Sequence, residues 1–415
     1  MPTSTSDRPR QALTPVCALL AVAAVPDAGA GAVVWTTPCM LSAAMLIAWA
    51  AESAQFFMAQ GLALAILAWL QTLPEFAVEA VLAWERKVSL LTAGLTGALR
   101  LLTGLGWPMI YFTAALFHRR RYRRPLGSIR LEDEHCVEVM GLLPPMAYAA
   151  IVWAKGSLNV IDAAILILMY VAYLAVLRRM PPKAEESIED LELIPRTVVT
   201  APRNTRVAAI AGLFVVGGGL IYFVAEPFLD SLQALAVNLG IPTFIFIQWV
   251  APFVSEFPEK VSAFYWARTV KGSPTALMNM VSSNINQWTL LAAMLPITYS
   301  ISIGAVTAIP FDAEQRLEVL MTLGQALLGA IFLIDMKLVW WEAAGLFALW
   351  FIQFALSPIK PGPTGIGFLA AHIHRWVTAA YFVWAAVEVG RMAAGKRQPA
   401  AFRLFGLMWK RHVRA

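Results

Sequence analysis

The chain has 415 residues, of which 59% are hydrophobic and only 14% are charged, and its formal net charge is +6. A soluble globular domain has about 25% charged residues, so this composition excludes that class and indicates a protein embedded in a bilayer. The excess of Lys and Arg indicates basic residues retained on the cytoplasmic side of a membrane, not a nucleic-acid partner. The three cysteines are scattered without metal-like spacing, which predicts no redox or metal role for them.

Residues 1–32 form the least regular part of the sequence. Arg8 and Arg10 precede a short apolar run over 12–25, which is followed by small residues over 26–30. This order is typical of a signal peptide, but the run is also long enough for a short helix. Because more hydrophobic sequence follows without a polar start, we expect a short helix or an interfacial segment here.

Ten long apolar stretches predict the core of the protein. A bilayer span needs about 20 mostly apolar residues, and each backbone amide in lipid must be paired within its own segment, so these stretches are expected to be helices. They lack the polar and apolar alternation of an outer-membrane barrel. The first five spans are expected at 33–51, 57–84, 88–116, 136–154 and 158–178. The second five are expected at 207–230, 241–267, 275–302, 314–334 and 338–357.

This pattern predicts an all-α polytopic membrane protein made of two halves. Residues 33–178 and 207–357 would be the two five-helix repeats, joined by a polar linker over 179–206 that is rich in acidic residues and proline. Residues 358–415 would hold one more helix, over 368–391, and a basic tail.

The distribution of Lys and Arg predicts the orientation. If the first core span enters from outside, most of these residues fall in the connections and tail that would face the cytoplasm. The linker and the tail are therefore expected in the cytoplasm, and the protein in the cell (inner) membrane.

Two Pro-Glu pairs, Pro74-Glu75 and Pro258-Glu259, lie inside the second span of each half. Proline has no amide hydrogen and clashes with the carbonyl group one turn back, so the helix is expected to break there. The freed carbonyl groups and the following carboxylate are the oxygen ligands that hard cations such as calcium prefer. One copy could equally be a proline kink whose glutamate is satisfied by a neighbouring donor, but two matching copies favour an ion site between two broken helices.

The second half carries further residues in a recognisable order. Gly240-Ile241-Pro242 begins the second span, Ser255 precedes Pro258-Glu259, and 279–285 follows in the third span. These residues resemble the calcium/cation antiporter superfamily, in its sodium/calcium exchanger membrane region. That family has two inverted repeats, each with a Gly-Thr-Ser-Leu-Pro-Glu signature and a later Gly-Ser-Asn-Ile-Phe-Asn signature. The resemblance covers roughly residues 40–357 and is closer in the second half.

The resemblance implies secondary transport of an inorganic cation, with calcium exchanged for sodium or protons by alternating access. It implies no cofactor and no enzymatic activity, because an ion gradient supplies the energy. The implied cation ligands are the carboxylates of Glu75 and Glu259, the hydroxyl groups of Thr72, Ser255 and Ser283, and the amide of Gln287.

The first repeat departs from the later signature. Residues 97–102 lie at its place, and Ala98 and Leu102 have no atom that can bind a cation. The first repeat is therefore expected to contribute fewer ligands than the second.

Four further charges stand near the signatures: Glu79, Glu256, Arg100 and Lys260. A buried charge needs a partner, so Arg100 could neutralise Glu79 while Lys260 neutralises Glu256, which would leave Glu75 and Glu259 for one divalent ion. Alternatively, Arg100 and Lys260 fill former cation sites, and the protein transports something else or nothing.

Other functions remain open on the sequence alone. A proton-coupled exchanger is one alternative, since carboxylates buried between helices can carry protons. A non-transporting sensor or scaffold with the same fold is another. His372 and His374 lack a third convergent ligand, so we interpret them as an interfacial anchor and not as a metal site.

Overall fold

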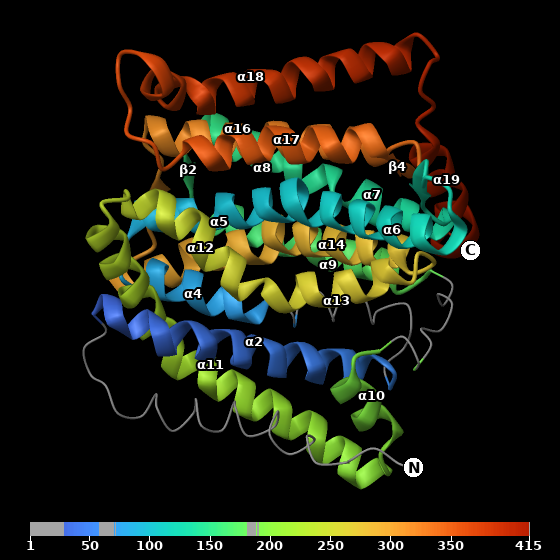
Figure 1. Cartoon of the computed structure of the whole chain (residues 1–415), viewed down its shortest axis with the longest axis horizontal. Coiled ribbons are helices and arrows are strands. Elements are labelled where there is room, and N and C mark those ends of the chain that lie inside the picture. Colours follow the sequence, from blue (N-terminus) through green and yellow to red (C-terminus); the bar gives the residue numbers. More distant parts are fainter. Residues whose placement is uncertain (1–28, 58–69, 71, 181–187, 189–190, 415) are drawn as a thin grey trace.

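Figure 1 shows the chain, in a computed structural model, as a bundle of long helices that run roughly along one common axis. The structure describes residues 29–57, 70, 72–180, 188 and 191–414. Residues 1–28 of the expected N-terminal segment 1–32, much of the second span and the centre of the linker lie outside the described residues.

The helices of the first half occupy the predicted spans. They begin with a short turn, η1 (Ala30–Ala32), and α2 (Val33–Gln55), followed by α4 (Leu73–Trp84), α5 (Val88–Leu101), η2 (Leu102–Gly106), α6 (Trp107–Tyr122), η3 (Asp133–His135), α7 (Cys136–Gly141), α8 (Leu143–Lys155) and α9 (Val160–Leu177). Local chemistry sets the start of α9, where the Asn159 side chain accepts hydrogen bonds from the backbone N–H groups of Ile161 and Asp162.

The second half follows the same order. Its elements are α11 (Arg203–Leu239), α12 (Thr243–Ser255), α13 (Phe257–Arg268), α14 (Ser273–Asn286), η5 (Gln287–Leu291), α15 (Ala292–Ile303), α16 (Ala313–Leu333) and α17 (Trp340–Leu356). The extra helix is α18 (Gly365–Ala393), and α10 (Leu193–Thr200), α19 (Ala400–Met408) and η6 (Trp409–Val413) add helical structure to the linker and the tail.

The helix α11 is longer than the span predicted at 207–230. Pro227 lies inside it, and the helix continues until Gly240, whose φ of 66° ends it in the left-handed region. A proline removes only one backbone hydrogen bond, so the helix continues past Pro227 and the polar residues near 230. It ends at a glycine, which adopts the left-handed conformation readily.

A helix begins at each of the two predicted breaks in the second spans. Between α12 and α13 the backbone of Glu256 leaves helical geometry, with φ −92° and ψ 3°, and Pro258 stands in the first turn of α13. In the first half, α4 begins directly after Thr72, and Pro74 stands in its first turn. Each Pro-Glu pair therefore opens a new helix inside the bundle.

The third span of each half also contains a matching irregularity. Segments η2 and η5 are single π-helical turns, each placed between two α-helical segments of its span. Such turns occur often at functional sites, because the wider turn displaces side chains from the regular α-helical positions. Gln287 opens η5, and Leu102 opens η2.

Two short strand pairs tie the halves together. Strand β1 (Ser128–Arg130) pairs antiparallel with β4 (Lys337–Val339), with Ser128 opposite Val339. Strand β2 (Ser157–Leu158) pairs with β3 (Ile309–Pro310). In each pair, the loop between the third and fourth spans of one half meets the loop between the fourth and fifth spans of the other half. That exchange requires the two repeats to be inverted relative to each other.

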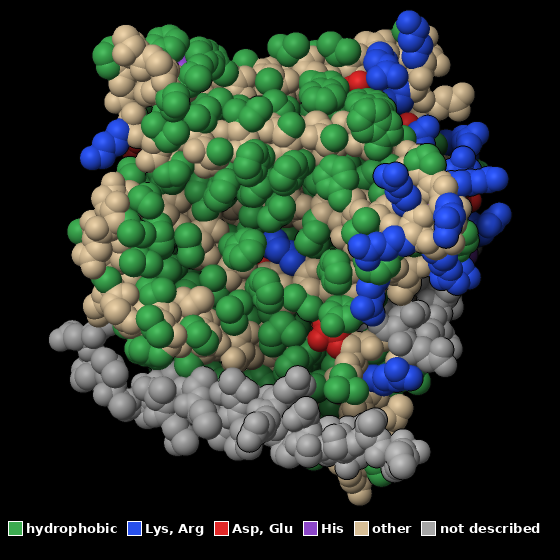
Figure 2. Space-filling model, in the orientation of Figure 1, with side chains coloured by type: hydrophobic (Ala, Val, Ile, Leu, Met, Phe, Trp, Pro, Cys, Tyr) green, Lys and Arg blue, Asp and Glu red, His purple; other side chains and the backbone are tan. Residues whose placement is uncertain are grey.

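The arrangement in space fits a bilayer. In Figure 1, α2 and α11 lie together along the lower edge, and α18 lies along the upper edge outside α16 and α17. A hydrophobic surface covers the middle of the face in Figure 2, and Lys and Arg gather at the end where α19 lies. Within the described residues, six helices are long and apolar enough to cross a membrane, so the chain is a multi-pass membrane protein.

We expect Gly97→Ala to lower the free energy of unfolding by about 1–3 kcal/mol. A Cβ at Gly97 would lie 1.9 Å from the backbone oxygen of Gln248, so α5 and α12 would have to separate. Thermal unfolding in detergent measures the effect. Gly218→Ala on α11 is the matched control, because nothing lies within 4 Å of its Cβ position. Equal melting temperatures for the two variants would contradict the close packing at Gly97.

Candidate cation site

The two Pro-Glu segments meet in the core at the side chain of Gln287. Its Nε2 donates to Glu75 Oε2 at 2.8 Å and to Glu256 Oε1 at 2.9 Å. Glu75 belongs to the first turn of α4, and Glu256 lies at the break between α12 and α13. All three side chains are buried. One amide of the second repeat therefore bridges carboxylates from both halves.

Glu259 stands in the first turn of α13 and is also buried. It accepts a hydrogen bond from the Ser283 hydroxyl group of α14. The next residue, Lys260, forms an ion pair with Glu256, with Nζ and Oε2 at 2.5 Å. The predicted pairing of Lys260 with Glu256 is thus present, and Glu259 has no basic partner among the described residues.

Thr72 and Ser255 differ in what they contact. Thr72 Oγ1 accepts a hydrogen bond from Asn286 Nδ2 at 2.5 Å, which joins the start of α4 to the end of α14. Ser255 Oγ donates to the backbone oxygen of Pro252, within its own helix, at 3.4 Å. Both are buried beside the breaks. Asn286, one position before Gln287, is an additional polar residue that the signatures do not single out.

Several oxygen atoms at this junction are buried and make no hydrogen bond within the described part of the chain: Glu75 Oε1, Glu259 Oε2, Gln287 Oε1 and Asn286 Oδ1. Buried polar atoms normally have a partner, and oxygen atoms of this kind are ligands for hard cations. No group of three or more His, Cys, Asp or Glu side chains among the described residues converges as a metal centre. A cation here would therefore need amide or hydroxyl oxygens in addition to carboxylates.

Glu79 lies one turn beyond Glu75 and packs against α5. A Cβ at Gly94 would lie 1.7 Å from Glu79 Oε1, so only glycine leaves room for this carboxylate. The predicted pair of Glu79 with Arg100 is wrong. Arg100 Nη2 lies 2.6 Å from Glu318 Oε2 on α16, because Arg100 is almost two helical turns from Gly94 and its side chain reaches α16.

Arg100 does not reach the bridged carboxylates, so it does not occupy a cation site at this junction. Its side chain contacts Glu318, Met321 and the ring of Trp249, and none of the bridged carboxylates. Ala98 and Leu102, the first-repeat counterparts of Ser283 and Gln287, are fully buried. The polar contacts of the junction are therefore asymmetric, since the third span of the second repeat supplies them and that of the first does not.

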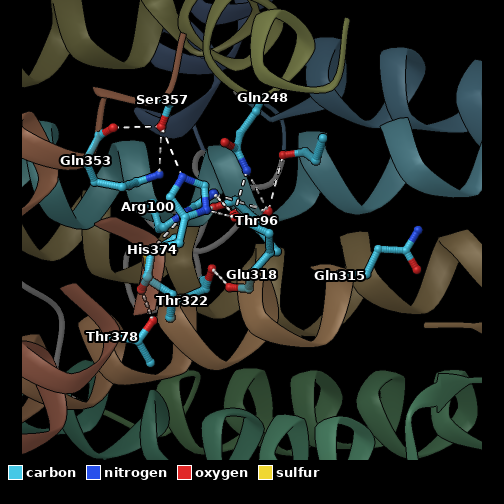
Figure 3. A network of polar contacts seen from close by, with 12 residues as sticks. Thr96, Arg100, Gln248, Gln315, Glu318, Thr322, Gln353, Ser357, His374 and Thr378 are labelled. Carbon is cyan, nitrogen blue, oxygen red and sulfur yellow. Dashed lines mark hydrogen bonds and ion pairs between the residues drawn. The ribbon is translucent and has the colours of Figure 1, made fainter. Parts of the chain in front are cut away.

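Some buried polar residues are not evident from the sequence. Glu52 in α2 accepts a hydrogen bond from Ser262 in α13, but it falls just beyond the predicted first span. Glu318 is the innermost charged residue of the predicted span 314–334, after Glu314 and Arg316, and this position is a signal that could have identified it. Figure 3 shows Glu318 with Arg100 and His374 in a polar network.

Replacing Gln287 with leucine, the residue found at position 102, should remove the bridge between Glu75 and Glu256. Two hydrogen bonds to charged groups are lost, so the half-saturating calcium concentration should rise about tenfold or more. Equilibrium binding of radioactive calcium measures it. Gln233→Leu is the matched control, because among the described residues Gln233 donates to a backbone oxygen of its own helix, α11. An unchanged affinity in Gln287→Leu would place the cation elsewhere.

Comparisons with known proteins agree with this architecture. The family model described as sodium/calcium exchanger protein matches residues 29–178 and 209–357. A crystal structure of the H+/Ca2+ exchanger CAX is 30% identical and has a TM-score of 0.82, with 97% of this chain and 96% of that chain covered. The sodium-calcium exchanger NCX_Mj shares the fold at 17% identity and a TM-score of 0.53, with 79% of this chain and 97% of that chain covered.

No protein with a curated description matches the chain. The family model nevertheless covers both halves, and the residues it matches include the two Pro-Glu segments and the bridging glutamine. The chain is therefore a member of the sodium/calcium exchanger family.

Proposed function

We propose that the protein is a secondary antiporter that exchanges calcium for protons across the cell membrane. The observation that carries this proposal is the bridge from Gln287 to Glu75 and Glu256, one carboxylate from each inverted repeat. A site shared by two inverted repeats can face either side of a membrane in turn as the repeats move relative to each other.

The charges at the junction explain how two ions can compete for one site. Glu75, Glu256 and Glu259 are buried beside a single ammonium group, that of Lys260, in the part described. An excess of buried negative charge is costly in a membrane. A bound divalent cation removes that excess, and so do protons on the carboxylates. Calcium and protons would therefore bind in alternation, which is the basis of antiport.

The choice of ions follows from chemistry and from similarity. Carboxylate, amide and hydroxyl oxygens suit calcium. The structure with 30% identity over nearly the whole chain is that of an exchanger of protons and calcium, whereas the likeness to a sodium-calcium exchanger is one of fold. We therefore propose that calcium transport is coupled to protons, with coupling to sodium as the alternative.

The test is uptake of radioactive calcium into proteoliposomes under an imposed gradient. Vesicles with an acidic interior should accumulate calcium, and a protonophore combined with a potassium ionophore should abolish the uptake. A sodium gradient of equal size, at equal pH on both sides, should give no accumulation. Uptake driven only by sodium would overturn proton coupling. No uptake under either gradient, with folded and inserted protein, would favour the non-transporting scaffold.

A further inference from the structure

A second buried polar network lies apart from the Pro-Glu junction, where α5, α12, α16 and α18 meet (Figure 3). Arg100 and Glu318 are 0% exposed and form an ion pair with Nη2 and Oε2 at 2.6 Å. Gln248 Nε2 donates to the same carboxylate oxygen at 2.7 Å. Ionisable groups inside a membrane are costly, so a network that does not contact the cation junction requires its own explanation.

The other oxygen of Glu318 is approached by the extra helix. His374 Nδ1, on α18, contacts Glu318 Oε1. The second ring nitrogen, Nε2, lies 3.2 Å from Ser357 Oγ at the end of α17. The imidazole ring of α18 is therefore held on both sides by the core, as Figure 3 shows.

The hydrogen bonds on both sides of the ring suit a doubly protonated imidazole. The hydroxyl group of Ser357 donates to the backbone oxygen of Gln353 at 2.6 Å. With its hydrogen directed there, the serine oxygen can accept from a protonated His374 Nε2. An ionised Glu318 carboxylate, whose other oxygen accepts from Arg100 and Gln248, can accept from a protonated Nδ1. An imidazole with both nitrogens protonated is a cation.

We infer that Glu318, His374 and Ser357 form a proton-binding site, separate from the cation carboxylates, in which one bound proton fastens α18 to the transport core. When the proton leaves, the ion pair with Glu318 becomes a hydrogen bond from a neutral ring, which is weaker. The Ser357 hydroxyl group must then turn from Gln353 to donate to Nε2, and the hold of α18 on α16 and α17 weakens.

Among the described residues, few charged groups surround the His374 ring. Arg100 faces it from α5 and Glu318 from α16, while α12 and α17 contribute the uncharged Gln248 and Ser357. Tyr381, farther along α18, is buried close to Arg100. The His374 side chain is 19% exposed, whereas the Glu318 side chain is fully buried.

The first test is nitrogen NMR of the full chain in lipid nanodiscs with labelled histidine. The sequence has five histidines, and His374→Gln identifies the signals of His374 by their loss. We expect both ring nitrogens of His374 to be protonated at neutral pH. A neutral His374 throughout the range in which imidazole ordinarily changes charge, about pH 5 to 8, would overturn the inference.

The second test measures how firmly α18 is held. Hydrogen exchange of α18, read against α2 as an internal reference, should accelerate when the pH is raised through the titration of His374. In His374→Gln it should be fast at every pH. His372→Gln is the matched control, because His372 lies on the same helix and, in the part of the chain described, contacts the backbone oxygen of Phe368 and neighbouring rings of α18. Protection in His374→Gln equal to that of the control would overturn the inference.

Neither test depends on which ion the protein transports. If calcium uptake fails while the NMR and exchange results hold, the proposed function is wrong and the proton-binding site stands. If uptake succeeds while His374 is neutral, the reverse is true.

Discussion

Replacing Glu259 with glutamine should abolish proton-driven calcium uptake into proteoliposomes, down to the level of empty vesicles. The carboxylate is buried, it accepts one hydrogen bond from Ser283, and its second oxygen makes no hydrogen bond among the described residues. Glutamine keeps the size of the side chain but removes its charge. It also places an amide donor where the cation requires an acceptor.

The matched control for this change is Glu314→Gln. Glu314 is an exposed residue in the first turn of α16, so its replacement alters the net charge equally without touching the junction. Uptake by this variant should equal that of the unmodified protein. Uptake that survives in Glu259→Gln, with the protein folded and inserted, would remove Glu259 from the transport site.

The largest loss of stability is expected for Arg100→Met. The change leaves the Glu318 carboxylate buried without its guanidinium partner, and breaking a buried pair in this way costs about 3–5 kcal/mol. Replacing both partners, as Arg100→Met with Glu318→Leu, should restore most of that loss, because no uncompensated charge then remains. Unfolding in detergent, followed by circular dichroism, compares the stability of the unmodified protein, of Arg100→Met and of the double variant.

Lys337→Met supplies the comparison for an exposed pair. Lys337 lies 3.5 Å from Asp335, and its side chain is 45% exposed, so its loss should cost no more than about 1 kcal/mol. If Arg100→Met is as stable as Lys337→Met, the Arg100–Glu318 pair does not hold α5 to α16.

Much of the fold follows from local patterns. Long apolar runs without charges give the helices, because lipid leaves the backbone no other way to satisfy its hydrogen bonds. Pro74 and Pro258 give the two breaks, since proline cannot continue the hydrogen-bond ladder. The pairing of Lys260 with Glu256 is also local, as the two residues are one helical turn apart.

The residues that were predicted wrongly are those whose partners lie far away in the sequence. Arg100 is separated from Glu318 by more than half of the chain, and Glu79 is closer in sequence, so proximity suggested the wrong partner. The place of His374 depends on how α18 packs on α16, which a single helix pattern cannot reveal. The bridging geometry of Gln287 likewise arises only when α4, α13 and η5 are brought together.

The central claim is that one cation is held jointly by carboxylates from both repeats, and equilibrium binding of radioactive calcium to the purified protein tests it most directly. We expect saturable binding in the unmodified protein, and its loss both in Glu75→Gln, in the first repeat, and in Glu259→Gln, in the second. Saturable binding that persists when both residues are replaced, in protein that remains folded, would contradict a cation site between the two broken helices.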